Sequence, residues 1–197
     1  MSRKPRVRYE LDTGGLKYLP SEDIIMILRA ADELITTGGR SMLARILKGS
    51  KDKKLLELNL QECPAYGYYH DKTLQEISYC IDYCIVEDYL DIEYSGRLPM
   101  LVFSPKGWEI ERHTYAIEWY QKLKSMAENK TIGMEQINEL LQVNREVVLE
   151  ILDTVKREKA AELEPVLLVW KEIEVKKVRL KISGVVASFH EHNTKDR

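Results

Sequence analysis

The chain has 197 residues, with 30 Lys and Arg against 32 Asp and Glu, so its formal net charge is −2. Its 44% hydrophobic and 31% charged residues are typical of a globular protein and exclude disordered, collagen-like and low-complexity chains. The longest apolar run, residues 166–170, is far shorter than the ~20 residues of a membrane span. Because no signal-peptide segment follows the basic N-terminus, we expect a cytoplasmic protein that does not bind membranes. The near-zero net charge argues at first against a nucleic-acid partner.

Several helices are predicted in the first third of the chain, after a basic tail over residues 1–20. Apolar residues recur at helical spacing over 22–35, which predicts an amphipathic helix. A short helix over 41–47 follows, and a third helix opens after Gly49 and reaches about residue 61.

A capping box and a β-hairpin complete the first predicted domain. Thr73 and Glu76 have the spacing of a capping box, in which the hydroxyl and the carboxylate each satisfy an amide at the start of a helix. Over residues 90–103 the apolar period changes to two, with a turn at 95–97, which predicts a β-hairpin. Helices followed by a hairpin are the order of a winged-helix domain, which we predict over residues 21–110. The predicted fold class is therefore α+β and mostly helical.

The second half predicts a divergent winged-helix or helix-turn-helix domain over residues 111–182. A helix near 113–128 precedes a short helix, a tight turn and a longer helix over 137–158, which is helix-turn-helix spacing. The chain then becomes rich in β-branched residues, and apolar residues alternate with basic ones over 177–182, as is typical of a strand. Residues 183–197 are expected to form a flexible tail.

Charge is unevenly distributed along the chain. Residues 1–111 hold 15 basic and 18 acidic residues, net −3, and residues 112–197 hold 15 and 14, net +1. Within the first half, however, the segment over residues 40–54 carries six basic residues and one acidic residue, Asp52. The six basic residues are Arg40, Arg45, Lys48, Lys51, Lys53 and Lys54. The net charge of the whole chain therefore averages over a strongly basic turn and acidic surroundings.

The centre of this basic segment suits a phosphate. Gly49 and Ser50 lie inside it, where they allow close approach of a phosphate and supply a hydroxyl donor. The start of the third predicted helix adds backbone N–H groups and a favourable dipole. The segment therefore predicts a phosphate clamp that positions nucleic acid without reading its sequence, although a solvated helix junction has the same composition.

A spaced set of motifs resembles the RQC (RecQ C-terminal) domain of RecQ-family DNA helicases over about residues 22–108. In chain order the motifs are GRSMLARILKGS at 39–50, KDKKLLE at 51–57, AYG at 65–67, the helix opened by Thr73, DYL at 88–90 and SPKG at 104–107. The resemblance implies a winged helix that grips duplex DNA, often near a junction between double and single strands. It also implies that Lys48, Gly49 and Ser50, the family's L-[RK]-G-S turn, contact phosphates, with Lys54 as their basic partner.

The resemblance also draws attention to the tip of the hairpin, because some RecQ helicases carry an aromatic residue there that separates the terminal base pair. The matching loop here is residues 94–97, with Tyr94 as the aromatic candidate and Arg97 as the basic residue. Because Tyr94 alternates with Leu90 and Ile92, it equally fits packing toward the core.

The chain departs from a RecQ helicase in what surrounds this domain. About 20 residues precede it, and the sequence has neither the G-x-x-x-x-G-K-[ST] phosphate loop nor the four-cysteine zinc module. We therefore expect a stand-alone relative with no enzymatic activity and no cofactor. Cys80 and Cys84 could ligate a metal, but their place on an apolar stripe favours core thiols. Tyr66, Tyr68 and Tyr69 could stack on a base or pack their loop.

These observations predict a non-catalytic protein that grips duplex or fork DNA, in DNA repair, recombination or replication. The predicted contacts are Arg40, Ser41, Arg45, Lys48, Gly49, Ser50, Lys51, Lys53, Lys54, Tyr94 and Arg97. One alternative is a transcription regulator that reads sequence through the helix-turn-helix at 137–158. Another is an interaction module, in which the acidic helix over 73–87 and the C-terminal half bind a helicase or another repair protein.

Overall fold

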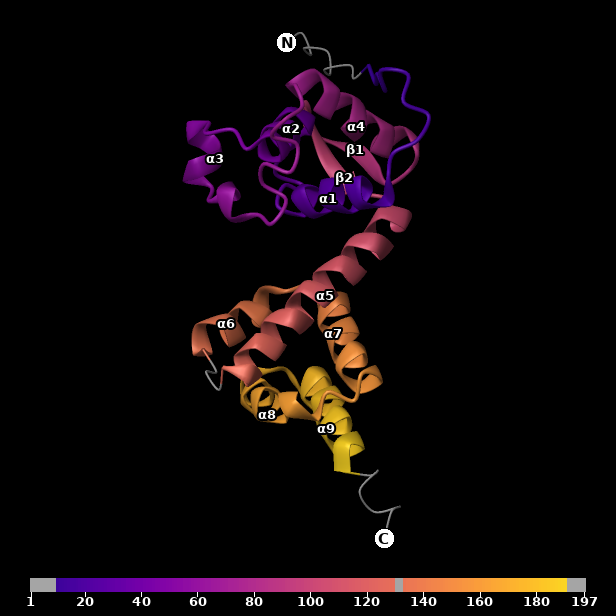
Figure 1. Cartoon of the computed structure of the whole chain (residues 1–197). Coiled ribbons are helices and arrows are strands. Elements are labelled where there is room, and N and C mark those ends of the chain that lie inside the picture. The colour runs from indigo at the N-terminus through magenta and orange to yellow at the C-terminus, as the bar shows by residue number, and fades with distance from the viewer. Residues whose placement is uncertain (1–9, 130–132, 191–197) are drawn as a thin grey trace. The chain divides into compact units, whose positions relative to one another are not determined.

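The computed structural model describes residues 10–129 and 133–190, and the chain divides into two compact units between Glu111 and Arg112 (Figure 1). We call residues 1–111 unit 1 and residues 112–197 unit 2. In the described part of the chain, no helix has the length and apolar character of a membrane span.

Unit 1 consists of helices followed by a β-hairpin, in the predicted order. Its elements are α1 (Ser21–Asp32), α2 (Arg40–Lys48), α3 (Lys53–Glu57), the 3-10 turn η1 (Leu60–Glu62), α4 (Leu74–Val86), β1 (Leu90–Ser95) and β2 (Leu98–Phe103). The helix α5 (Pro105–Glu128) begins in unit 1 and continues into unit 2. The capping box at the start of α4 is confirmed, because Thr73 Oγ1 accepts from the Glu76 N–H at 3.2 Å and Glu76 Oε2 accepts from the Thr73 N–H at 2.7 Å.

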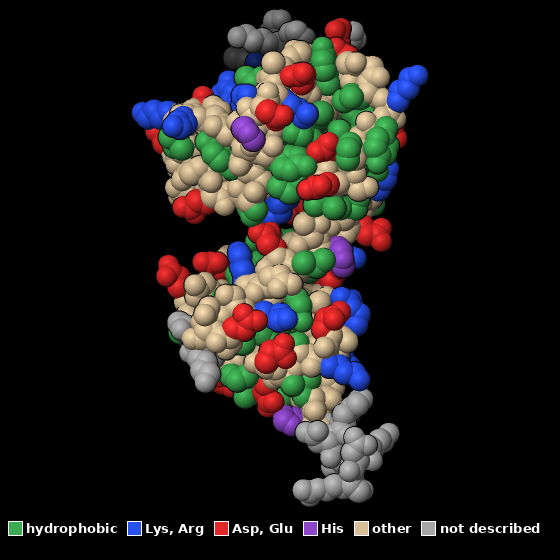
Figure 2. Space-filling view, viewed as in Figure 1, with side chains coloured by type: hydrophobic (Ala, Val, Ile, Leu, Met, Phe, Trp, Pro, Cys, Tyr) green, Lys and Arg blue, Asp and Glu red, His purple; other side chains and the backbone are tan. Residues whose placement is uncertain are grey.

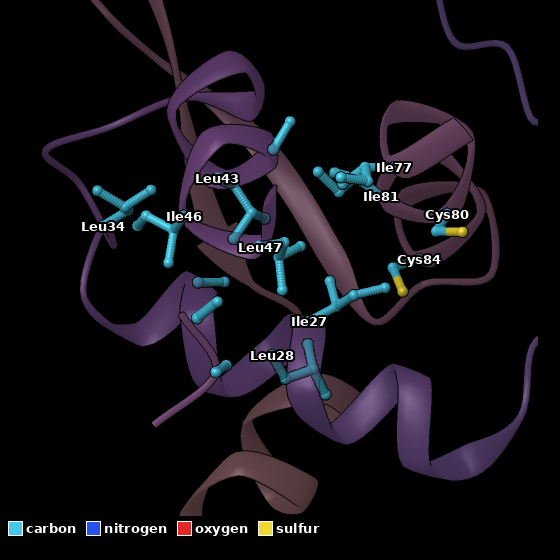
Figure 3. Packing of buried hydrophobic residues seen from close by; sticks show 14 of the residues in the cluster. Ile27, Leu28, Leu34, Leu43, Ile46, Leu47, Ile77, Cys80, Ile81 and Cys84 are labelled. Atoms are coloured by element: carbon cyan, nitrogen blue, oxygen red, sulfur yellow. The ribbon is translucent and has the colours of Figure 1, made fainter. Parts of the chain in front are cut away.

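The core of unit 1 lies between α1, α2 and α4, whose apolar stripes face one another. Figure 3 shows the labelled side chains of this cluster: Ile27, Leu28, Leu34, Leu43, Ile46, Leu47, Ile77, Cys80, Ile81 and Cys84. All of them are buried, and those on the three helices recur at helical spacing along the inward faces.

The hairpin is joined to the helices by the loop that follows α1. Leu90 pairs with Phe103 and Ser95 with Leu98, which leaves Gly96 and Arg97 as the turn. The Leu101 N–H donates to the Gly38 carbonyl at 3.0 Å, and the Leu101 carbonyl accepts from the Thr36 N–H at 3.2 Å. The loop thus takes part in the backbone hydrogen bonding of β2, and the result is a mostly helical α+β winged helix, as predicted.

Two boundaries in unit 1 differ from the prediction. The third helix, expected over 50–61, is reduced to α3 and η1, because Asp52 caps α3 and Asn59 has a left-handed φ of 54° that ends the helical path. The predicted tail over residues 1–20 is partly packed, since Leu19 is buried. Residues 1–9 of that tail lie outside the described residues.

Unit 2 is helical throughout its described residues. Besides the rest of α5, it contains α6 (Met134–Glu139), η2 (Leu140–Gln142), α7 (Arg145–Arg157), η3 (Ala161–Leu163), α8 (Glu164–Ile173) and α9 (Lys176–His190). The short helix, turn and longer helix predicted over 137–158 are present as α6, η2 and α7.

The predicted strand over 177–182 is wrong, because these residues lie in α9. Val178, Ile182 and Val185 are buried at helical spacing, whereas Leu180 is 65% exposed. Three alternating apolar residues fitted a period of two, and the later buried residues show that the true period is that of a helix. The second predicted domain therefore has no wing in its described part. The tail expected from residue 183 is also shorter, since α9 continues to His190 and only 191–197 lie outside the described residues.

Candidate nucleic-acid interface

The turn that follows α2 is a Schellman motif centred on Gly49. Gly49 has a left-handed φ of 73°; its N–H donates to the Ile46 carbonyl at 2.9 Å, and the Ser50 N–H donates to the Arg45 carbonyl at 2.9 Å. A Cβ on Gly49 would lie 3.0 Å from the Gly67 Cα. The glycine is therefore required by its φ and by the close approach of two backbone segments. Since both N–H groups cap α2, neither is available to a phosphate.

Lys48 braces the same turn from its other side. Its Nζ donates to the carbonyl oxygens of His70 and Lys72, both at 2.6 Å. The Tyr69 N–H also donates to the Leu47 carbonyl at 2.8 Å, so the segment around it is fastened to the end of α2. The ammonium group of Lys48 thus connects α2 to the loop and holds the turn in position.

The three tyrosines of this loop pack the turn. The Tyr66 hydroxyl donates to the Ser50 carbonyl at 2.9 Å, and the Tyr68 hydroxyl donates to Asp23 Oδ1 at 2.8 Å. Burial and the Asp23 carboxylate raise the pKa of Tyr68 to about 12. Tyr69 is 3% exposed. Of the two alternatives, the structure favours packing over base stacking for these rings.

Arg40 lies at the opposite end of α2 and has an internal partner. Its Nη1 pairs with Oδ2 of Asp82, a residue that is 1% exposed. The same oxygen accepts from the Asp12 N–H at 2.8 Å. Arg40 and the turn at 48–50 are separated by the length of a nine-residue helix, about 12 Å. The predicted contacts therefore do not form one patch, and Arg40 neutralises a buried carboxylate.

The start of α3 does not offer the open anion site that the sequence predicted. The Asp52 carboxylate accepts from the Lys54 N–H at 3.0 Å and pairs with Arg45 Nη1 at 3.1 Å. A carboxylate of the chain itself thus occupies the position where a phosphate was expected. The predicted phosphate clamp therefore loses this helix terminus and keeps only side chains as its candidate contacts.

The basic side chains that remain exposed gather around α3. Within the described residues, Lys51 and Lys54 are exposed and form no ion pair. Lys53 is 90% exposed and pairs weakly with Glu57 at 3.5 Å. Figure 2 shows a group of blue Lys and Arg side chains at the edge of unit 1 where Figure 1 labels α3. Together with the braced Ser50, they form what we call the α3 basic surface: Arg45, Ser50, Lys51, Lys53 and Lys54. Ser41 is exposed at the start of α2, apart from this surface.

The hairpin tip presents residues other than the predicted aromatic one. Tyr94 is half-buried and lies opposite Pro99. Arg97 is exposed at the turn, and Leu98 beside it is 64% exposed. Leu98 was not among the contacts predicted from the sequence, although Pro99 beside it was an available signal for an edge strand.

The outer face of α4, the helix before the hairpin, carries no basic residue and is partly covered. A Cβ on Gly14 would lie 2.4 Å from the Tyr79 ring, so the N-terminal segment packs directly on this helix. The Asp12 N–H donates to Asp82 on the same helix. Since α4 (Leu74–Val86) contains neither Lys nor Arg, it is poorly suited to enter a groove of DNA.

Cys80 and Cys84 lie in the core of unit 1, as their apolar stripe predicted. Burial raises the pKa of both thiols, which keeps them protonated and disfavours metal ligation. In the described ranges, no three His, Cys, Asp or Glu side chains are grouped as metal ligands would be.

A family model of the RQC domain matches residues 20–128, a little over half of the chain. The chain belongs to the RQC domain family. RQC domains are winged-helix domains of RecQ helicases, which bind DNA. The predicted resemblance is thereby confirmed, and the RQC match extends beyond the predicted residue 108 through the whole of α5.

One relative with an RQC region is the "ATP-dependent DNA helicase RecQ" of Bacillus subtilis (strain 168). It is 29% identical over 125 residues, which cover 64% of this chain and 21% of the relative. The chain thus spans about a fifth of the length of this RecQ protein. No solved structure matches the chain. The helices α6 to α9 lie outside the RQC match.

Proposed function

We propose that this chain is a non-catalytic DNA-binding protein that grips the backbone of duplex or forked DNA through its RQC domain, in DNA repair, recombination or replication. The observation that carries the proposal is the α3 basic surface, where exposed lysines flank a turn that is braced from two sides. The absence of the G-x-x-x-x-G-K-[ST] phosphate loop from the sequence supports a role without ATP hydrolysis.

The proposed contacts are divided between two tasks. Lys51, Lys53 and Lys54 neutralise phosphates, the Ser50 hydroxyl donates to one, and Arg45 exchanges Asp52 for a phosphate. A second set, Lys48, Gly49 and the loop tyrosines, holds the turn in place. Because lysines contact backbone and the outer face of α4 lacks basic residues, this mode of binding is largely independent of base sequence.

We expect Lys51→Ala with Lys54→Ala to weaken DNA binding in a salt-dependent way. With about four cations on phosphates, the slope of log K against log salt is about −4, and each lost contact flattens it by about 0.9. The double variant therefore flattens the slope by about two units, as measured by fluorescence anisotropy on a labelled duplex. K51R with K54R is the matched control and should retain the slope. An unchanged slope in the alanine variant would remove the α3 basic surface from the interface.

The same titration on duplex, forked and single-stranded DNA separates the proposal from its alternatives. Tighter binding to forks than to duplex supports a repair, recombination or replication role. A strong preference for one duplex sequence would instead favour a transcription regulator that uses α7. A stable complex with a helicase and no measurable DNA affinity would favour an interaction module.

A further inference from the structure

The first half of α9 presents a second group of basic side chains, in unit 2 and outside the RQC match. Lys176, Lys177 and Arg179 are all exposed, and residues 175–190 contain no acid. We call these three side chains the α9 basic face. On the opposite side of the helix, Val178 and Ile182 are buried and fix which residues point outward.

Two acids close to this face, Glu174 just before α9 and Asp153 on the neighbouring helix α7, have other partners. Glu174 accepts from the Trp170 Nε1–H at 3.0 Å and from the Val175 N–H at 3.1 Å. Asp153 of α7 pairs with Lys181 at 2.5 Å. Over the described ranges, therefore, Lys176, Lys177 and Arg179 form no ion pair, and their charge is available to an external anion.

The chemistry of the surrounding surface selects the kind of anion. Beyond Leu180, the outward positions of α9 include the small residues Ser183, Gly184 and Ala187, and the space beside Gly184 is open. The large apolar side chains exposed beside the three cations are Leu180 and Val175, which are too few to insert into a lipid layer. The exposed ring of α9 is that of His190 at its last residue, which contacts Glu164 at 3.1 Å. Clustered cations with open space beside them are complementary to the regularly spaced negative charges of a phosphate backbone.

We propose that the α9 basic face is a second nucleic-acid contact, which binds the phosphate backbone independently of sequence. The inference rests on the proposed DNA-binding function and adds a site in a part of the chain that the RQC match does not cover. Three cations within one helical turn span about 4.5 Å along the axis, while one strand of a duplex carries a phosphate charge per ~3.4 Å. The three side chains can therefore engage two or three phosphates.

The test compares two triple variants of the full chain. Lys176→Ala, Lys177→Ala and Arg179→Ala remove the α9 basic face. Arg145→Ala, Lys156→Ala and Arg157→Ala remove three exposed basic residues of α7 in the same unit. Both change the net charge from −2 to −5, since each removes three positive charges.

We expect the α9 variant to flatten the salt slope on a labelled duplex by about two to three units. The loss of affinity between about 50 and 200 mM salt would then be up to about 40-fold smaller than for the wild type. The α7 variant should change the slope by less than about one unit. Equal slopes for the α9 variant and the wild type, or equal flattening by both variants, would overturn the site. Circular dichroism confirms that both variants are folded.

The α3 variant K51A with K54A distinguishes failure of this site from failure of the proposed function. If that variant loses binding and the α9 variant does not, DNA binding stands and the α9 site is wrong. If the wild-type chain binds no DNA at all, both proposals are wrong.

Discussion

Replacing Arg40 by alanine is expected to lower the free energy of unfolding by about 3–5 kcal/mol. The guanidinium neutralises Asp82, which is 1% exposed, and the variant leaves that buried carboxylate with the hydrogen bond from the Asp12 N–H but without the positive charge. Removal of one partner of a buried pair is costly because the other charge cannot be rehydrated without opening the core. Urea denaturation, with hydrogen exchange of unit 1 peptides as a second probe, measures the loss.

Two further variants test the explanation. Arg45→Ala removes an arginine from the same helix, but its pair with Asp52 is exposed, so we expect a loss below about 1 kcal/mol. Arg40→Met combined with Asp82→Leu removes both charges of the pair and should recover most of the stability lost in Arg40→Ala. If Arg40→Ala were as stable as the wild type but had a flatter salt slope, Arg40 would belong to the DNA interface after all.

Elements controlled by neighbouring residues could be predicted from the sequence. The capping box at the start of α4 depends on Thr73 and Glu76, three residues apart, and hydrogen bonds from Thr73 lower the pKa of the Glu76 carboxyl in the folded chain. The hairpin followed from a change of apolar period, and its two-residue turn at Gly96 and Arg97 needs only the positive φ of a glycine. In both cases, residues that are close together in the sequence determine the local structure.

The roles of individual basic residues could not be predicted in this way. Arg40 pairs with a residue 42 positions away, and Lys48 binds carbonyls 22 and 24 positions away. A count of charges along the chain cannot distinguish these internal partners from an external phosphate. The sequence thus located the basic segment correctly but could not divide it into bracing residues and exposed ones.

The α9 basic face illustrates the opposite error, because exposed basic residues were not predicted to share a surface. Lys177 and Arg179 of this face were visible in the sequence, but together with Lys181 they alternate with Val178, Leu180 and Ile182, which indicated a strand. On a strand, alternate residues would have shared one polar face, whereas on α9 the exposed arc includes Leu180 as well. The period therefore decides which side chains share a surface, and an error in the period hides a surface patch.

The SPKG motif at 104–107 gives the second large expected effect, at Gly107 in the first turn of α5. A Cβ on Gly107 would lie 1.8 Å from the Tyr89 carbonyl oxygen, a backbone atom just before β1. The helix cannot move away easily, because the Gly107 N–H donates to Ser104 Oγ at 3.0 Å and the Ser104 N–H donates to the Tyr89 carbonyl at 3.3 Å. Gly107→Ala should therefore destabilise unit 1 by about 3 kcal/mol.

Gly184→Ala is the matched control, because Gly184 lies in α9 where the space for a Cβ is open. There the usual helix preference for alanine should raise stability by up to about 1 kcal/mol. Hydrogen exchange of peptides from β1 and α4 assigns the Gly107→Ala loss to unit 1, since those segments should exchange faster while α9 peptides remain protected. Wild-type stability for Gly107→Ala would mean that α5 can shift away from Tyr89. In that case the SPKG motif would not be explained by the close backbone packing between α5 and Tyr89.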